Sequence, residues 1–106
     1  MVLTRDFKET VKARVARDPG FREALLAEAA EQLLAGDLEI GKAVLRDFIN
    51  ATVGFEQLAR DTGKPSKSLM RMLGPNGNPT ASNLLTILGQ LQRTSGIHLA
   101  VVTASR

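Results

Sequence analysis

The sequence contains no cysteine, tryptophan or tyrosine, and only one histidine. Without cysteine the chain can form neither a disulfide nor a thiolate metal site, and His98 alone cannot build a multi-histidine centre. Four phenylalanines are the only aromatic residues, which disfavours RNA-binding modules that stack bases on aromatic platforms. The sequence shows no nucleophile, base and orienting group at a spacing that would indicate a catalytic site. We therefore expect no enzyme, no cofactor and no metal.

Long apolar runs are also missing. None approaches the roughly 18 residues that a membrane helix requires, and the charged opening MVLTRDFKETVK is unlike a signal peptide. A length of 106 residues suits one domain. We expect a single cytoplasmic domain over residues 1–106 that has no contact with a membrane.

Acidic side chains are absent after Asp61, although the chain has 11 of them. The remaining part carries only basic charges, which are Lys64, Lys67, Arg71, Arg93 and Arg106. Residues 18–39, in contrast, hold six acids against Arg22 alone. This asymmetry suggests two surfaces with different partners, one of them a polyanion, or simply solvated helix faces.

Apolar residues recur at helical spacing and predict an all-α fold of five to six helices. N-terminal helices are expected within residues 1–35 and a helix-turn-helix core over residues 37–94, with Asp18, Asp37 and Thr80 as helix caps. The residues expected to face the core are Phe7, Val11, Val15, Phe21, Leu25, Leu26, Ala29, Leu33, Leu34, Ile40, Val44, Leu45, Phe48, Ile49, Leu84, Leu85, Leu88 and Leu91.

Residues 97–102 (IHLAVV) are β-branched and apolar and predict one short C-terminal strand. A lone strand cannot satisfy its backbone polar groups, so we expect it to pair with the same strand of a second copy. Ile97, Leu99 and Val101 would then form the dimer strand. The alternative is an irregular tail that lies over the helices.

Residues 55–73 (FEQLARDTGKPSKSLMRML) have the spacing of a helix-turn-helix. Ala59 is small where the two helices cross, and Gly63 suits the positive φ at which the first helix ends. Pro65 fits the start of the second helix. Leu58, Leu69 and Leu73 are expected to hold the pair of helices against the domain.

The outer face of the second helix carries small hydroxyls and cations. Arginine and lysine can donate to guanine in the major groove, and serine can meet a base or a phosphate. Lys64 in the turn and the amides of the following loop are placed for phosphates. The predicted DNA-binding residues are Lys64, Ser66, Lys67, Ser68, Arg71, Asn76 and Asn78. The alternative is two packed helices with a basic solvent face.

Several segments resemble the HigA-type addiction-module antidote proteins. They are Arg17-Asp18-Pro19, residues 33–37 (LLAGD), residues 45–51 (LRDFINA), Gly54-Phe55-Glu56 and above all residues 62–80 (TGKPSKSLMRMLGPNGNPT). The resemblance implies a λ-repressor-like fold that dimerises, binds double-stranded operator DNA and represses its own operon. It also implies neutralisation of a small basic RelE-like ribonuclease toxin. Carried over to this chain, the resemblance makes Ser66, Lys67, Ser68 and Arg71 operator-reading residues.

A basic toxin would be expected to bind acid, and residues 18–39 provide it. Glu23, Glu28 and Glu31 are the candidate partner-binding residues. They could equally form a solvated face turned away from DNA. The basic first helix, with Arg5, Lys8, Lys12, Arg14 and Arg17, could contact a partner or flanking DNA. A rival function is a helical protein-interaction module without specific DNA binding.

Overall fold

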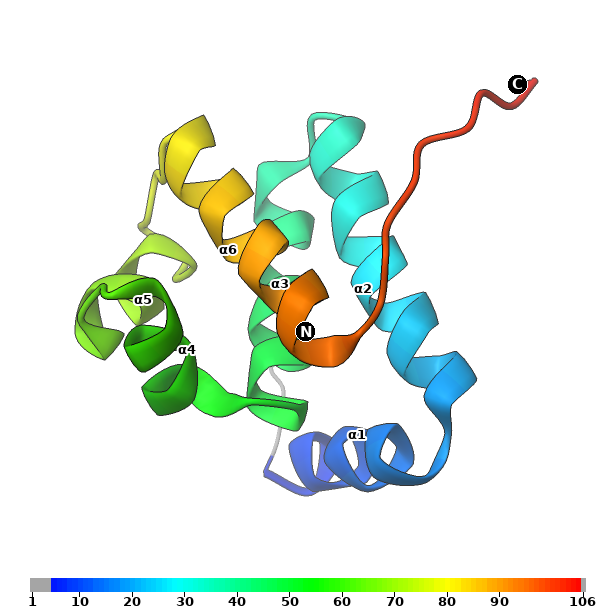
Figure 1. The fold of residues 1–106 in the computed structure, drawn as a ribbon, viewed down its shortest axis with the longest axis horizontal. Coiled ribbons are helices and arrows are strands. Elements are labelled where there is room, and N and C mark those ends of the chain that lie inside the picture. The colour runs from blue at the N-terminus through cyan, green and yellow to red at the C-terminus, as the bar shows by residue number, and fades with distance from the viewer. Residues whose placement is uncertain (1–4, 106) are drawn as a thin grey trace.

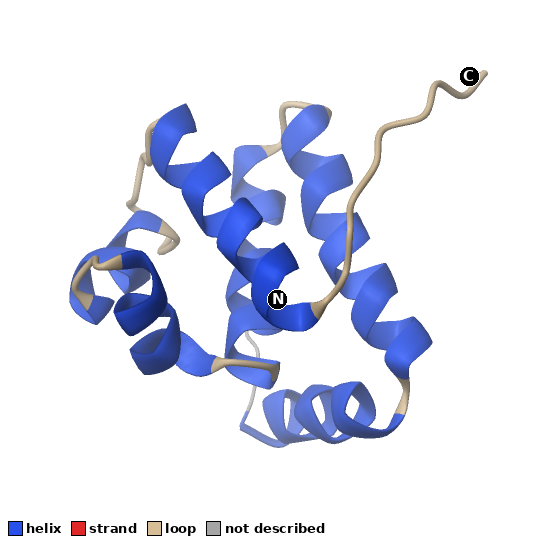
Figure 2. Ribbon diagram, viewed as in Figure 1, coloured by secondary structure: helices blue, strands red, loops and turns tan. Residues whose placement is uncertain are grey.

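The computed structural model describes residues 5–105, and their only regular secondary structure is helical (Figure 2). The six helices are α1 (Arg5–Arg17), α2 (Pro19–Leu34), α3 (Leu38–Ala51), α4 (Gly54–Thr62), α5 (Ser66–Met72) and α6 (Ala81–Ser95). The expected all-α class is therefore confirmed.

Side chains cap three of the helices where the sequence predicts caps. Asp18 accepts from the Phe21 amide at 3.2 Å, and Asp37 accepts from the Ile40 amide at 3.1 Å. Thr80 accepts from the amide of Asn83 at 3.1 Å. Each bond satisfies an amide that the first helical turn leaves without a partner. Local chemistry thus sets the starts of α2, α3 and α6.

Helix α3 lies at the centre of the molecule, with α1 and α2 on one side, α4 and α5 on the other, and α6 crossing in front of it (Figure 1). Its most extensive contact is with α2. A Cβ added at Gly41 would lie 2.5 Å from Cδ2 of Leu33, so glycine allows the two helices to approach closely. Leu45, Phe48 and Ile49 of α3 are fully buried in the core.

The predicted core is correct in most places and wrong in three. Leu34, Ile40 and Leu85 are 71%, 47% and 67% exposed, and Ile87 is fully buried instead. In α3 the buried face runs through Gly41 and Lys42 rather than Ile40. Apolar residues outnumber the places available on one helix face, so periodicity alone does not separate core from surface. Phe7 lies outside the described side chains.

The C-terminal run has no strand in this structure. Residues 97–105 form an extended tail that leaves the end of α6, runs along α2 and projects from the body (Figure 1). Two hydrogen bonds hold its start: the Ile97 amide donates to Ser95 Oγ at 3.2 Å, and the Leu99 amide donates to Gln92 Oε1 at 2.9 Å. The predicted strand is not confirmed: a strand exists only where a second one pairs with it, and in the single chain this segment has no partner strand.

Within residues 5–105, no helix is long and apolar enough to cross a membrane.

Candidate nucleic-acid interface

Helices α4 and α5 are joined by a three-residue turn whose geometry follows from its sequence. Gly63 has φ of 71°, and its amide donates to the carbonyl of Ala59 at 2.9 Å. This left-handed residue ends α4, as predicted. Pro65 precedes α5 in an extended conformation, with φ of −61° and ψ of 140°. The turn therefore redirects the chain within a few residues.

Three leucines fix this pair of helices to the domain. Leu58 of α4, Leu69 of α5 and Leu73 just after α5 are all fully buried, as the sequence predicts. They belong to one core cluster with Leu45 and Phe48 of α3. Burial of each leucine side chain contributes about 1.5–3 kcal/mol. The short α5 is therefore stabilised mainly by tertiary packing, since seven residues alone would not form a stable helix.

The opposite face of α5 points to solvent. Lys67 and Arg71 are exposed at i, i+4 spacing, and Met70 between them is 46% exposed. Ser66 and Ser68 are half-buried. Met72 packs against the core instead. The helix thus presents two cations, two hydroxyls and one thioether on a protruding surface.

Two cationic side chains of α3 bind carbonyl groups of the loop that follows α5. The fully buried Lys42 donates from Nζ to the carbonyls of Gly74 and Gly77 at 3.0 and 2.7 Å. Arg46 donates to the carbonyl of Leu73. These carbonyls lie at and beyond the C-terminal end of α5, where helical acceptors lack partners and a positive charge is favoured. Neither cation was predicted as part of the interface.

Gly77 allows the same loop to pack against α5. A Cβ at this position would lie 2.1 Å from the carbonyl oxygen of Arg71 and 2.3 Å from that of Met72. The predicted phosphate contacts Asn76 and Asn78 flank Gly77, and both are exposed. The loop therefore places two exposed amide side chains near the C-terminal end of α5.

An acidic residue that the sequence pattern did not indicate also lies at this surface. Glu56, in the first turn of α4, is exposed and accepts a hydrogen bond from Ser66 Oγ at 3.1 Å. On the same helix Arg60 donates to Gln57 at 2.8 Å, and Gln57 donates to Asp61 at 2.8 Å. The surface around α5 is thus mixed rather than purely basic. The absence of acids after residue 61 did not predict this, because the acids of α4 precede that residue in the sequence but lie near α5 in the fold.

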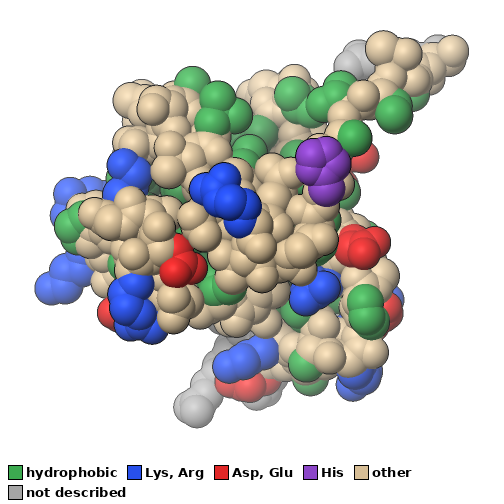
Figure 3. Space-filling view, viewed as in Figure 1, with side chains coloured by type: hydrophobic (Ala, Val, Ile, Leu, Met, Phe, Trp, Pro, Cys, Tyr) green, Lys and Arg blue, Asp and Glu red, His purple; other side chains and the backbone are tan. Residues whose placement is uncertain are grey.

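Figure 3 shows lysine and arginine side chains gathered at the edge formed by α4 and α5, with acidic side chains beside them. The predicted turn cation Lys64 is half-buried. Glu23, Glu28 and Glu31 are all exposed on α2, which Figure 1 places on the other side of the molecule. The predicted basic and acidic surfaces therefore lie on different helices, far apart on the fold.

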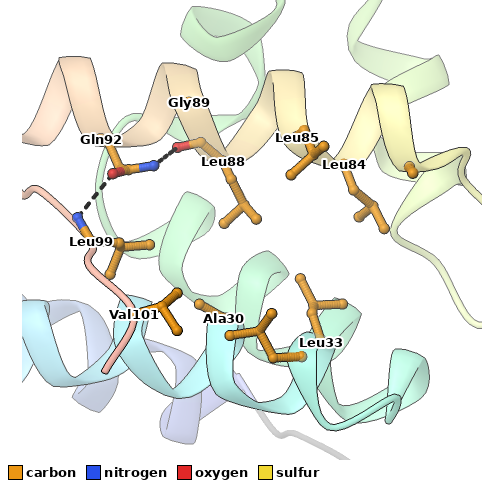
Figure 4. A pocket seen from close by; sticks show the side chains of 11 residues that line it. Ala30, Leu33, Leu84, Leu85, Leu88, Gly89, Gln92, Leu99 and Val101 are labelled. Atoms are coloured by element: carbon orange, nitrogen blue, oxygen red, sulfur yellow. Dashed lines mark hydrogen bonds between the residues drawn. The ribbon is translucent and has the colours of Figure 1, made fainter. Parts of the chain in front are cut away.

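An apolar groove of about 410 Å³ lies between α2 and α6 and is bordered by the tail (Figure 4). Leu84, Leu85 and Leu88 line it from α6, Leu33 and Leu34 from α2, and Leu99 and Val101 from the tail. Ile97 and Leu99, two of the predicted dimer-strand residues, pack against the core, whereas Val101 is 79% exposed.

No group of three or more metal-ligating side chains occurs in the described part of the chain. The chain matches no protein-family model, and comparison with curated proteins and with solved structures finds no significant match.

Proposed function

We propose that this protein is a sequence-specific DNA-binding regulator that reads operator DNA with α5. The observation that carries the proposal is the arrangement of this helix: Leu69 and Leu73 anchor it in the core, while Lys67 and Arg71 project from its opposite side. A helix supported in this way can enter a major groove without exposing the core. Lys64 and the exposed Asn76 and Asn78 would bind the phosphates on either side.

We further propose that the protein acts in the cytoplasm as a homodimer on a two-fold symmetric operator. The tail supports this. Residues 100–105 make no hydrogen bond to any other described residue, and Val101 and Val102 are 79% and 83% exposed. The tail of a second copy would satisfy that backbone and cover the apolar groove. Two recognition helices would then lie about 34 Å apart, one turn of DNA.

The resemblance to HigA-type antidote proteins supports a narrower proposal. In it, the domain has a λ-repressor-like fold, represses its own operon and neutralises a small basic RelE-like toxin. The exposed Glu23, Glu28 and Glu31 on α2 would bind the toxin on a surface separate from α5. Complementary charge would accelerate their association.

A protein-interaction module without specific DNA binding is the second candidate, and the apolar groove between α2 and α6 favours it. The two functions are separated by the binding of purified protein to its own promoter fragment and to a scrambled fragment. Selective binding supports the regulator. Equal and weak binding to both fragments would contradict it and favour the interaction module.

A further inference from the structure

Glu56 and Ser66 form a polar pair across the helix-turn-helix. The Glu56 carboxylate accepts from Ser66 Oγ at 3.1 Å, which joins the first turn of α4 to the first turn of α5. Glu56 is exposed and Ser66 is half-buried. A carboxylate beside a DNA-reading helix repels phosphates and lowers the overall affinity for DNA. We therefore looked to base selectivity as the role of Glu56.

The Glu56 and Ser66 side chains, once bonded to each other, can accept further hydrogen bonds but cannot donate one. A carboxylate can only accept, so the hydroxyl proton of Ser66 is used in the bond to Glu56. The lone pairs that remain on Ser66 Oγ are acceptors too. The two side chains therefore offer only acceptors, next to the uncapped backbone amides of the first turn of α5. Lys67 and Arg71, one and five residues after Ser66, present only donors.

A pair of side chains that can only accept is selective in the major groove. Phosphate oxygens, guanine N7 and O6, and thymine O4 are all acceptors and would repel it. Only the amino groups of adenine and cytosine donate there. The adenine amino group lies between adenine N7 and thymine O4, both acceptors, whereas the cytosine amino group lies at the outer end of its base pair's pattern. Cytosine is therefore the better partner.

We propose that Glu56 and Ser66 together form a specificity-determining element that reads the amino group of one cytosine in each operator half-site. This inference rests on the proposed DNA-binding function. In this arrangement the Ser66 hydroxyl would not donate to a phosphate, because its proton is used in the bond to Glu56. In this proposal the Glu56 carboxylate weakens DNA binding by repelling phosphates, and a hydrogen bond from the matching cytosine offsets that loss.

The test is selection of bound sequences from a randomised DNA duplex pool by four proteins: wild type, Glu56→Gln, Ser66→Ala and Asp61→Asn. Glutamine can both donate and accept, and it pairs with adenine N6 and N7. Glu56→Gln should therefore move one position of each half-site from cytosine to adenine, with a change in relative preference of roughly tenfold or more. Ser66→Ala should weaken the cytosine preference without switching it.

Asp61→Asn is the matched control, because it removes one exposed carboxylate charge from the same helix. It should leave every base preference unchanged. Circular dichroism melting of all four proteins identifies a variant that does not fold, and either Glu56→Gln or Ser66→Ala alone then decides the outcome.

Unchanged base preference in the folded variants would overturn the reading role of the pair while leaving DNA binding intact. A shift of equal size in Asp61→Asn would overturn it too, since bulk charge would then be the cause. Wild-type protein that selects no sequence would overturn both this inference and the proposed function.

Discussion

The side-chain nitrogen of Lys42 lies 2.7 Å from the carbonyl oxygen of Gly77, a residue 35 positions further along the chain. Lys42 is fully buried, and it also bonds the Gly74 carbonyl at 3.0 Å and pairs with Glu39 at 3.0 Å. A buried ammonium is tolerated only where such partners replace water. Lys42 thus ties the loop after α5 to α3.

Lys42→Met should destabilise the fold by about 1–3 kcal/mol, because the partly buried Gly77 carbonyl loses its donor and the Gly74 carbonyl keeps only the Gly77 amide. The apolar part of methionine fills similar space, so the loss reports the hydrogen bonds. The measurement is urea unfolding followed by circular dichroism. Lys67→Met, at an exposed position of α5, should change stability by less than about 0.5 kcal/mol. Equal effects of the two substitutions would contradict the anchoring role.

Gly77→Ala and Gly89→Ala should change stability in opposite directions. At Gly77 the new methyl would overlap the carbonyl oxygens of Arg71 and Met72, with a cost of about 1–3 kcal/mol. At Gly89, inside α6, the nearest atom would be the flexible Arg93 Nη1 at 3.4 Å. Alanine should stabilise that helix by about 0.5–1 kcal/mol. Thermal melting measures both, and a neutral Gly77→Ala would refute the close approach.

Arg71→Ala and Lys64→Ala should affect DNA binding differently. If Arg71 reads guanine, its removal costs about 1–3 kcal/mol at one base and relaxes preference there. Loss of a phosphate contact at Lys64 should weaken binding to all sequences alike and reduce the salt dependence by about one ion. Lys12→Ala, on α1, should leave base preference unchanged. Operator preference that survives Arg71→Ala would disprove its assignment.

A dimer through the tail and groove should dissociate when charge is placed there. Leu85→Glu and Val101→Glu should give the mass of one chain by light scattering at micromolar concentration, because each puts a carboxylate into an apolar contact. Ile40→Glu is the control, since Ile40 is also an exposed apolar residue but lies outside the groove. A Val101→Cys variant has one cysteine, so its disulfide crosslink reports the pairing directly. Wild-type protein that is monomeric and forms no crosslink would exclude this dimer.

Charge reversal of Glu23, Glu28 and Glu31 to lysine should weaken binding of a basic toxin encoded beside this protein. All three side chains are exposed, so the substitutions should spare the fold. Titration calorimetry with the neighbouring protein provides the measurement, and an unchanged affinity would remove α2 as the partner surface. Reversal of Asp61 to lysine on α4 serves as a control for net charge.

The sequence predicts those features that depend on neighbouring residues. Asp18, Asp37 and Thr80 cap helices because each side chain bonds an amide three positions ahead. Gly63 ends α4 for an equally local reason, its positive φ. Leu58 and Leu69 were predictable because helical periodicity places both on the inner face.

Other features depend on contacts between distant residues and were missed or misjudged. Lys42 occupies a core position of α3 because the loop beyond α5 supplies its partners. The pairing of Glu56 with Ser66 spans ten positions and two helices. Leu85 has the spacing of a core residue, yet it borders the groove. Residues 97–102 have strand composition, but pairing requires a neighbour that a single chain does not provide.

The most direct test of the central claim is fluorescence anisotropy of purified protein with its own promoter fragment and a scrambled fragment at two salt concentrations. We expect selective binding to the promoter that weakens steeply as salt increases, because lysine and arginine displace counterions. We also expect Arg71→Ala to reduce the selectivity by about 1–3 kcal/mol. Weak binding that is equal for both fragments would contradict the claim that α5 reads an operator.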